Sequence, residues 1–187
     1  MNSKILLGIV ALGIVVVGFF LFACEDDWCM VFAWQKVQAV NTFDDCVRLG
    51  FPVSESYPPQ CHAGSKSFAK DVGNEIDKID LIRINWPRPG SAIKKGVPLL
   101  VKGEARGNWF FEASFPIVLK DGNGAVLAEG VAQAEGEWMT TQFVPYVATL
   151  AFSGTPTTNN GTLTLHKDNP SGMPEHDDAL VIPLTFE

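Results

Sequence analysis

The stretch Phe115-Pro116-Ile117-Val118-Leu119-Lys120-Asp121-Gly122-Asn123-Gly124 decides the fold class. Large apolar side chains stand at every second position, at Phe115, Ile117 and Leu119. This period of two is that of a β-strand with one buried face. Asp, Gly and Asn follow at once, and these residues form tight turns. The stretch therefore predicts a strand that ends in a turn to its neighbour.

Short alternating runs recur on both sides of this stretch. They are Leu99/Val101, Leu150/Phe152, Leu163/Leu165 and the run at Val181. Turn-forming residues separate the runs, at 88–90, 155–156, 159–161 and 169–172. About seven strands at this spacing, with no amphipathic helix of convincing length between them, are typical of a β-sandwich. We therefore expect a mainly β domain over residues 79–187.

Several motifs of this region point to a known family. They are, in chain order, Pro87-Arg88-Pro89-Gly90-Ser91, Val101-Lys102-Gly103-Glu104-Ala105, Trp109-Phe110-Phe111-Glu112-Ala113-Ser114-Phe115, Gly136, Trp138-Met139, Pro145-Tyr146, Gly161-Thr162-Leu163 and Asp168-Asn169-Pro170-Ser171-Gly172. With these motifs, the region resembles the immunoglobulin-like domain of bacterial spore-germination proteins. The resemblance implies an immunoglobulin-like β-sandwich on a cell-envelope protein, and it implies no established reaction.

The segment from Trp109 to Glu112 holds three consecutive aromatic residues. They cannot all point inward from a strand, so we expect at least one on the surface, available to a partner or to a sugar ring. The candidate binding residues are Trp109, Phe111, Glu112 and Trp138. The alternative interpretation is that these aromatic side chains fill the core and cover an edge of the sheet.

The segment 168–172 is rich in oxygen-bearing side chains, and Glu175, Asp177 and Asp178 follow it. One interpretation is a Ca²⁺ site. The segment lacks the regular spacing of a calcium loop, so we interpret it as a turn in which Asp and Asn bond their own backbone. The three histidines form no metal-binding pair, and no phosphate-binding or nucleophile motif occurs. We expect no metal, no cofactor and no catalytic residue.

Residues 5–23 form an uncharged apolar run. A transmembrane helix needs about 20 apolar residues, and the run has this length. Lys4 precedes it and acidic residues 25–27 follow it. Because positive charge tends to stay cytoplasmic, the C-terminal part is expected outside the cytoplasm. We expect residues 1–24 to anchor the chain in the cytoplasmic membrane as a single-pass helix.

Two alternatives to this anchor are a cleaved signal peptide and a lipoprotein signal. A signal peptide has an apolar core of about 7–15 residues and a cleavage site of small residues, and this run is longer and lacks the site. Leu21-Phe22-Ala23-Cys24 resembles a lipobox, which would place a lipid on Cys24. Lipidation also keeps the protein at the membrane.

All four cysteines, Cys24, Cys29, Cys46 and Cys61, precede residue 62. Outside the cytoplasm such a cluster favours disulfides. Of the three pairings, the economical one joins Cys24 to Cys29 and Cys46 to Cys61. Zinc is the alternative, although paired C-x-x-C knuckles are absent. If Cys24 carried a lipid, Cys29 would lose its obvious partner.

Residues 25–62 form a short cysteine-containing module. Thr42-Phe43-Asp44-Asp45-Cys46-Val47, Gly50, Pro52-Val53, Glu55-Ser56-Tyr57-Pro58 and Gln60-Cys61 resemble a two-cysteine module of membrane-anchored bacterial proteins. Within it, Asn41 or Thr42 can cap a helix over 43–49, with Gly50 just past its end. The polar residues 63–78 are expected to be a linker.

The formal net charge is −7, and no basic stripe offsets it. Nucleic-acid binding is therefore not expected. The pattern favours a binding or structural module of the cell envelope, with a protein, peptidoglycan or a second copy as partner. The alternative is an envelope hydrolase in which Glu112 works with Asp168 or Asp177, since two carboxylates about 5–10 Å apart perform glycoside chemistry.

Overall fold

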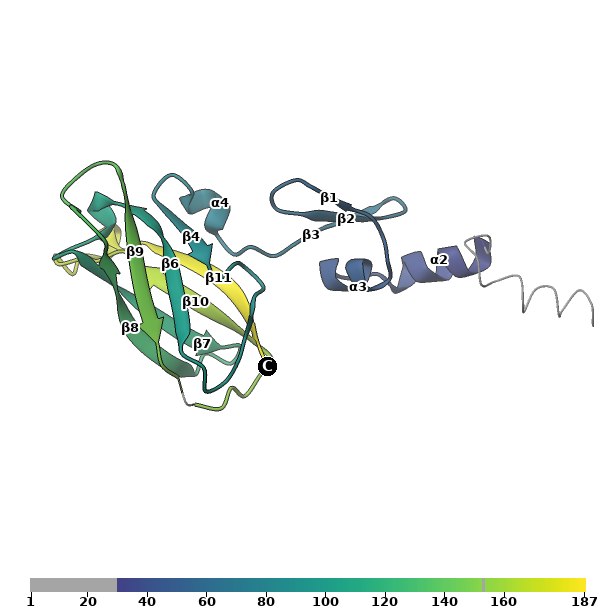
Figure 1. Cartoon of the computed structure of the whole chain (residues 1–187). Helices are drawn as coiled ribbons and strands as arrows, with labels where there is room; N and C mark the ends of the chain where they lie inside the picture. Colours follow the sequence, from purple (N-terminus) through teal and green to yellow (C-terminus); the bar gives the residue numbers. More distant parts are fainter. Residues whose placement is uncertain (1–29, 153) are drawn as a thin grey trace, which may run out of the picture. The chain divides into compact units, whose positions relative to one another are not determined.

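The computed structural model describes residues 30–152 and 154–187 (Figure 1). The chain divides into two compact units, Met1–Lys70 and Asp71–Glu187. The expected anchor at residues 5–23, the Cys24–Cys29 pairing and the lipidation of Cys24 lie outside the described residues. Within the described ranges, no helix has the length and apolar composition needed to cross a membrane.

The first unit combines two helices with a small antiparallel sheet. Its elements are α2 (Met30–Ala39), α3 (Phe43–Arg48), β1 (Val53–Ser54), β2 (Gln60–Ala63) and β3 (Lys66–Ala69). The predicted helix is confirmed as α3, and Thr42 is its N-cap, since its Oγ1 accepts the backbone N–H of Asp45 at 3.0 Å. Gly50 follows with a φ of +82°, which suits glycine after a helix.

A disulfide joins Cys46 of α3 to Cys61 of β2, with a Cα–Cα distance of 6.0 Å. This confirms the second of the two expected pairings. Both cysteines are fully buried, and Val40 and Ala63 complete the small core around them. A unit with so few buried apolar residues depends on such a covalent link.

The segment 63–78, which we expected to be a linker, contains two regular elements instead. Lys66–Ala69 pairs with β2 as strand β3 of the first unit. Glu75–Lys78 forms the short helix α4 of the second unit. The cysteine module therefore extends beyond residue 62, and the second unit begins before residue 79.

The second unit is built from eight strands. They are β4 (Ile82–Trp86), β5 (Ala92–Ile93), β6 (Leu99–Arg106), β7 (Ser114–Asp121), β8 (Val126–Ala134), β9 (Phe143–Leu150), β10 (Asn160–His166) and β11 (Ala179–Phe186). Two 3-10 turns, η2 (Gly107–Trp109) and η3 (Pro174–His176), lie in the connections. The hydrogen-bonded order is β4-β6-β9-β8-β7-β10-β11-β5.

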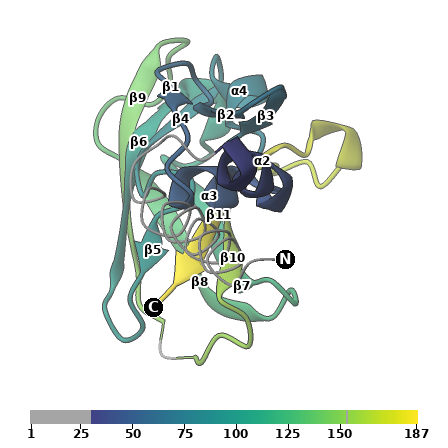
Figure 2. The same cartoon turned by 90° about the vertical axis from the view of Figure 1, so that its right-hand side faces the viewer.

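This sheet folds over on itself into two layers (Figures 1 and 2). β4, β6 and β9 lie in one layer, and β7, β10 and β11 lie in the other. β8 pairs with β7 along most of its length but joins β9 through two residue pairs alone, at Gln133 and Ala134. The layers face each other across the core, where the rings of Phe115 (β7) and Tyr146 (β9) meet edge to face at 5.0 Å. The predicted β-sandwich is confirmed.

In β6, β7, β9 and β10 every second residue is buried, as the alternation predicts. Leu99, Val101, Phe115, Ile117, Leu119, Leu150, Phe152, Leu163 and Leu165 all lie in the core. At β11 the predicted phase is wrong, because Leu180 and Ile182 point inward and Val181 is half-buried. The core and the residues packed against it all fall between Leu81 and Phe186. The second unit thus has a complete core of its own and can fold by itself.

Asn74 covers the outer edge of β11 ahead of α4. Its backbone N–H donates to the carbonyl oxygen of Val181 at 3.2 Å, and its Oδ1 accepts the backbone N–H of Val181 at 2.7 Å. Its Nδ2 donates to the carbonyl oxygen of Ala179 at 2.9 Å. Residues 90–91 and β5 bond to the rest of this edge. The edge of β11 is therefore closed to the addition of another strand.

Candidate binding surface at one end of the sandwich

Three connections meet at one end of the sandwich, which we call the loop end. They are residues 107–113 between β6 and β7, residues 135–142 between β8 and β9, and residues 167–178 between β10 and β11. The backbone N–H of Asp168 donates to the carbonyl oxygen of Trp109 at 3.0 Å, which ties the first connection to the third. The loop end thus gathers the aromatic segment and the 168–172 turn, although some 60 residues of chain separate them.

Trp109 belongs to the core and not to the surface. Its side chain is 1% exposed, and Phe110 is buried beside it, with its ring 5.2 Å from that of Phe115. The 3-10 turn η2 rotates both side chains inward, which an extended strand cannot do. In the described part of the chain, the indole Nε1 of Trp109 is the one buried side-chain donor with no partner. The prediction that Trp109 is a contact residue is therefore wrong. For this residue, the alternative interpretation as part of the core is confirmed.

Phe111 and Glu112 occupy a tight turn that projects from the loop end. The backbones of Phe111 and Ser114 exchange two hydrogen bonds of 3.0 Å, and the residues between them, Glu112 and Ala113, have φ values of 50° and 61°. Two successive positive φ values define a type I′ turn, which favours Asn-Gly. A left-handed backbone costs a residue with a Cβ about 1–2 kcal/mol. The two hydrogen bonds between Phe111 and Ser114 hold the strained backbone in place, and Phe111 and Glu112 are exposed there.

An open hollow of about 380 Å³ separates this turn from the third connection. It is lined by Asn108, Phe110, Phe111, Lys167, Asp168, Asn169, Pro170, Ser171 and His176. The wall from the third connection is held by its own bonds: Ser171 Oγ lies 3.0 Å from His176 Nδ1, and Asn169 Nδ2 donates to Asp177 Oδ1 at 2.7 Å. The hollow therefore has an aromatic side and a polar side.

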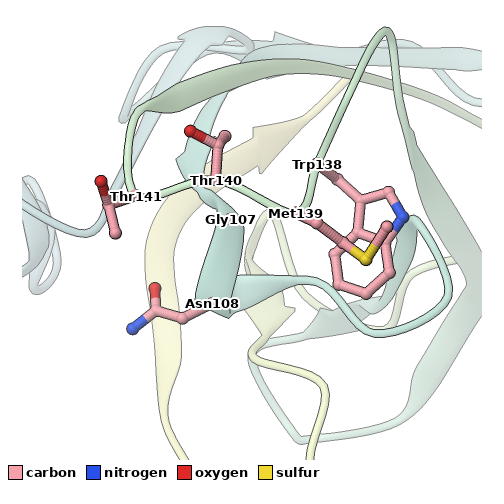
Figure 3. Close-up of a pocket in the computed structure, with 6 residues that line it drawn as sticks. All are labelled: Gly107, Asn108, Trp138, Met139, Thr140 and Thr141. Atoms are coloured by element: carbon pink, nitrogen blue, oxygen red, sulfur yellow. The ribbon is translucent and has the colours of Figure 1, made fainter.

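A second hollow, of about 500 Å³, lies between η2 and the 135–142 connection (Figure 3). Figure 3 shows Trp138 and Met139 on one side of it and Asn108, Thr140 and Thr141 on the other. Trp138 is half-buried, and Met139 is 74% exposed, the highest value among the large apolar side chains of the described residues. Such a flexible thioether on the surface suits an adaptable contact.

Gly107 allows the 135–142 connection to pack against η2. A Cβ at this position would lie 2.0 Å from the carbonyl oxygen of Thr140 and 2.2 Å from that of Trp138. Arg106 holds the same connection from below, since its Nη1 donates to the carbonyl oxygen of Thr141 at 2.9 Å. Gly107 and Arg106 therefore position the 135–142 connection, which carries Trp138.

The loop end brings three of the four predicted binding residues to the surface. Phe111 borders the first hollow, Trp138 lines the second, and Glu112 stands exposed beside Phe111. Asn108 lines both hollows and joins them, which sequence patterns did not signal. Met139, which lines the second hollow, was also not predicted, although its place beside Trp138 could have suggested it.

The carboxylates proposed for hydrolysis are not assembled in one cavity. Of Glu112, Asp168 and Asp177, only Asp168 lines the first hollow, and Asp177 is engaged with Asn169. Among the described residues, no group of three or more His, Cys, Asp or Glu side chains could hold a metal ion. At the loop end, exposed apolar side chains stand among polar ones.

The model of one protein family matches residues 81–174, half of the chain, and describes the immunoglobulin-like domain of bacterial spore germination. The chain belongs to this family. Comparison with curated proteins gave no match. In this spore-germination immunoglobulin-like domain, the matched residues include the first two connections of the loop end and most of the third. The match stops before β11, so the domain of this chain extends past it by one strand that is central to the core.

Proposed function

We propose that the chain is a membrane-anchored binding module that works outside the cytoplasm, and that its immunoglobulin-like domain contacts a protein or cell-wall partner through the loop end. The observation that carries the proposal is the exposure of Phe111 and Met139 beside two hollows joined by Asn108. An exposed apolar surface rimmed by polar residues is typical of a site of protein interaction or ligand binding.

The anchor follows from the sequence. The run 5–23 is long enough to cross a bilayer, and Lys4 before it and residues 25–27 after it favour an orientation with the sandwich outside. The Cys46–Cys61 disulfide supports the same location, because disulfides persist outside the reducing cytoplasm. A lipid on Cys24 is the alternative means of attachment.

Site-specific photo-crosslinking in the intact, membrane-bound chain tests the binding surface. A photoreactive residue at Phe111 or Met139 is expected to give adducts with envelope material, and the matched position Val131, equally apolar and 51% exposed on β8, is not. The adducts at Met139 should disappear in the Phe111→Ala variant. Equal labelling at all three positions would remove the loop end as the contact surface.

Mass spectrometry of the mature N-terminus tests the attachment. An intact N-terminal helix, with Met1 or Asn2 as the first residue, supports the transmembrane anchor. A diacylated Cys24 as the first residue would replace the helix by a lipid. An unmodified N-terminus beyond residue 24 would show that neither attachment exists.

A further inference from the structure

The second unit carries another apolar surface at the end opposite the loop end. A hollow of about 240 Å³ lies there, and Trp86, Lys94, Val97 and Leu100 are among its lining residues. Trp86, Val97 and Leu100 are 48%, 50% and 38% exposed. We call this surface, together with Lys95 and Lys102, the lysine end.

The two surfaces lie at the two ends of one strand. β6 starts at Leu99, which lines the hollow of the lysine end, and finishes at Arg106, next to Gly107 of the loop end. Eight residues of extended chain span roughly 25 Å. One domain therefore presents an apolar surface at each end.

The charges of the lysine end are positive. Lys94 lines the hollow, and Lys102 stands opposite Trp86 in the pairing of β4 with β6. In the described chain, neither of these side chains, nor that of Lys95, forms an ion pair. Two acids lie nearby. The backbone N–H of Glu187 donates to the carbonyl oxygen of Ile93 at 3.1 Å, and Glu104 lies two residues from Lys102 on the same face of β6, where it pairs with Arg83 at 2.9 Å.

The charges of the loop end are mainly negative. Its carboxylates are Glu112, Glu135, Glu137, Asp168, Glu175, Asp177 and Asp178. Within the described residues, Asp178 pairs with Lys78 at 2.5 Å, and the other six form no ion pair. The cations beside them are Lys78, which is paired with Asp178, Lys167 and Arg106. Arg106 is already engaged, because its Nε and Nη1 donate to the carbonyl oxygens of Asp80 and Thr141.

We propose that the partner of the loop end is the lysine end of a second copy, so that the domains associate head to tail. Each end offers exposed apolar side chains inside a rim of one charge, and the two rims have opposite signs. Complementary charge selects the partner and its register, and burial of the apolar side chains stabilises the contact. The proposal rests on the proposed function, since it names the partner of the same surface.

A contact between two different surfaces does not close on itself. Each copy keeps one free loop end and one free lysine end, so a chain of copies can grow. The covered edge of β11 prevents the competing mode on that side, in which copies pair strand to strand. For copies held on a membrane, the effective concentration is high, and a weak contact suffices.

Charge reversal in the fragment 71–187 tests the proposal. The loop-end variant is Glu112→Lys with Glu135→Lys, and the lysine-end variant is Lys94→Glu with Lys102→Glu; none of the four side chains makes a hydrogen bond in the described structure. Glu129→Lys on β8, away from both ends, is the matched control. Thermal unfolding first checks that each variant remains folded.

Sedimentation equilibrium at low salt, up to the order of 1 mM, gives the readout. The average mass of the unaltered fragment is expected to rise with concentration past that of a dimer, and to fall to that of a monomer in about 1 M salt. Each reversal should lower the association constant about tenfold or more. The control variant should leave the association constant unchanged. A one-to-one mixture of the two reversed variants should associate again, because each pair of meeting ends then carries opposite charges.

A fragment that stays monomeric throughout overturns the inference, as do reversed variants that associate like the control. A dimer that never grows further also overturns it. If the fragment is monomeric but the photoreactive Met139 still captures a wall glycan or a foreign protein, the proposed function stands and the second copy is excluded as partner. If Met139 and Phe111 capture nothing at all, the proposed function fails as well.

Discussion

The carboxylate of Asp121 accepts two hydrogen bonds from Thr157, one from its Oγ1 at 2.6 Å and one from its backbone N–H at 3.0 Å. Two further backbone donors, of Asn123 and Ala125, bond to the other oxygen of the same buried side chain. One carboxylate thus joins the turn after β7 to Thr157 before β10. A charged acceptor with four donors is favoured strongly over its protonated form.

Acid is expected to destabilise the second unit through Asp121. The hydrogen bonds from Thr157, and then those from Ala125 and Asn123, hold the pKa of Asp121 below its ordinary value. Because the folded pKa is the lower one, this stabilisation is complete above the ordinary pKa, near 4, and disappears as the pH falls through the folded pKa. Thermal unfolding of the fragment 71–187 between pH 7 and pH 2 measures it. Asp121→Asn should lower Tm at neutral pH and flatten the dependence, and an unchanged slope would contradict this assignment.

Alkali is expected to act through Tyr146. Its hydroxyl donates to the carbonyl oxygen of Arg83 at 3.0 Å, and burial, followed by the charges of Glu75 and Glu104, raises the pKa of Tyr146 above its ordinary 10.0. The folded state therefore keeps the proton that the unfolded state releases, so stability is complete below pH 10 and falls above it.

Tyr146→Phe isolates this effect. The variant should lose about 1 kcal/mol at neutral pH with the hydrogen bond. Its free energy of unfolding should then depend less on pH between pH 9 and pH 11. Urea unfolding at each pH measures both quantities. If the variant and the unaltered fragment lost stability in parallel above pH 10, another group would be responsible.

The turn at Glu112 and Ala113 is expected to gain stability from Asn-Gly. Both residues have positive φ, and the replacement Glu112→Asn with Ala113→Gly removes most of the strain. A gain of about 1–2 kcal/mol should follow, visible as a higher urea midpoint with an unchanged m-value. Ala125→Gly, in an exposed position of negative φ, is the control and should not stabilise. A loss of stability in the double variant would mean that the side chains of Glu112 and Ala113 contribute more than the strain costs.

Reduction of Cys46–Cys61 is expected to loosen the first unit alone. The bridge closes a loop with a sequence separation of 15, which is worth about 3 kcal/mol in the chain-entropy model. Limited proteolysis of the intact chain, with and without reductant, tests this: cleavage should appear within residues 40–70, and the fragment 71–187 should persist. The Cys46→Ser variant should behave like the reduced protein. Equal protection with and without reductant would show that the small core around the cysteines suffices.

Sequence periodicity predicts a strand where large apolar residues alternate, as in β7 and β10. It misses β8, because the inward positions there are Ala128, Gly130 and Ala132, whose small side chains carry little apolar signal. Close packing requires a glycine at Gly130, because a Cβ there would lie 2.6 Å from Leu150 Cδ2 of the facing layer. The linker expectation failed similarly, because β3 and α4 are too short and too polar to show a period.

The candidate surface could be predicted in part. The excess of aromatic residues indicated that some must be exposed, and Phe111 is. Trp109 is buried because it lies in η2, and a 3-10 turn breaks the alternation on which the expectation of exposure rested. Asn108 lines one hollow with Trp138 and the other with Asp168. This arrangement depends on how three connections pack at one end of the sandwich, and no local sequence pattern indicates that packing.

The bonds of Asn74 also decide how the second unit would carry a mechanical load. A pull on the chain ahead of residue 71 first reaches Asn74, which is bonded to Val181 and Ala179 of the last strand. The force would thus reach β11, in which Leu180 and Ile182 are fully buried. The three hydrogen bonds of Asn74 to this strand would take up the load first. A domain joined to its tether in this way resists extension before any strand of its core is drawn out.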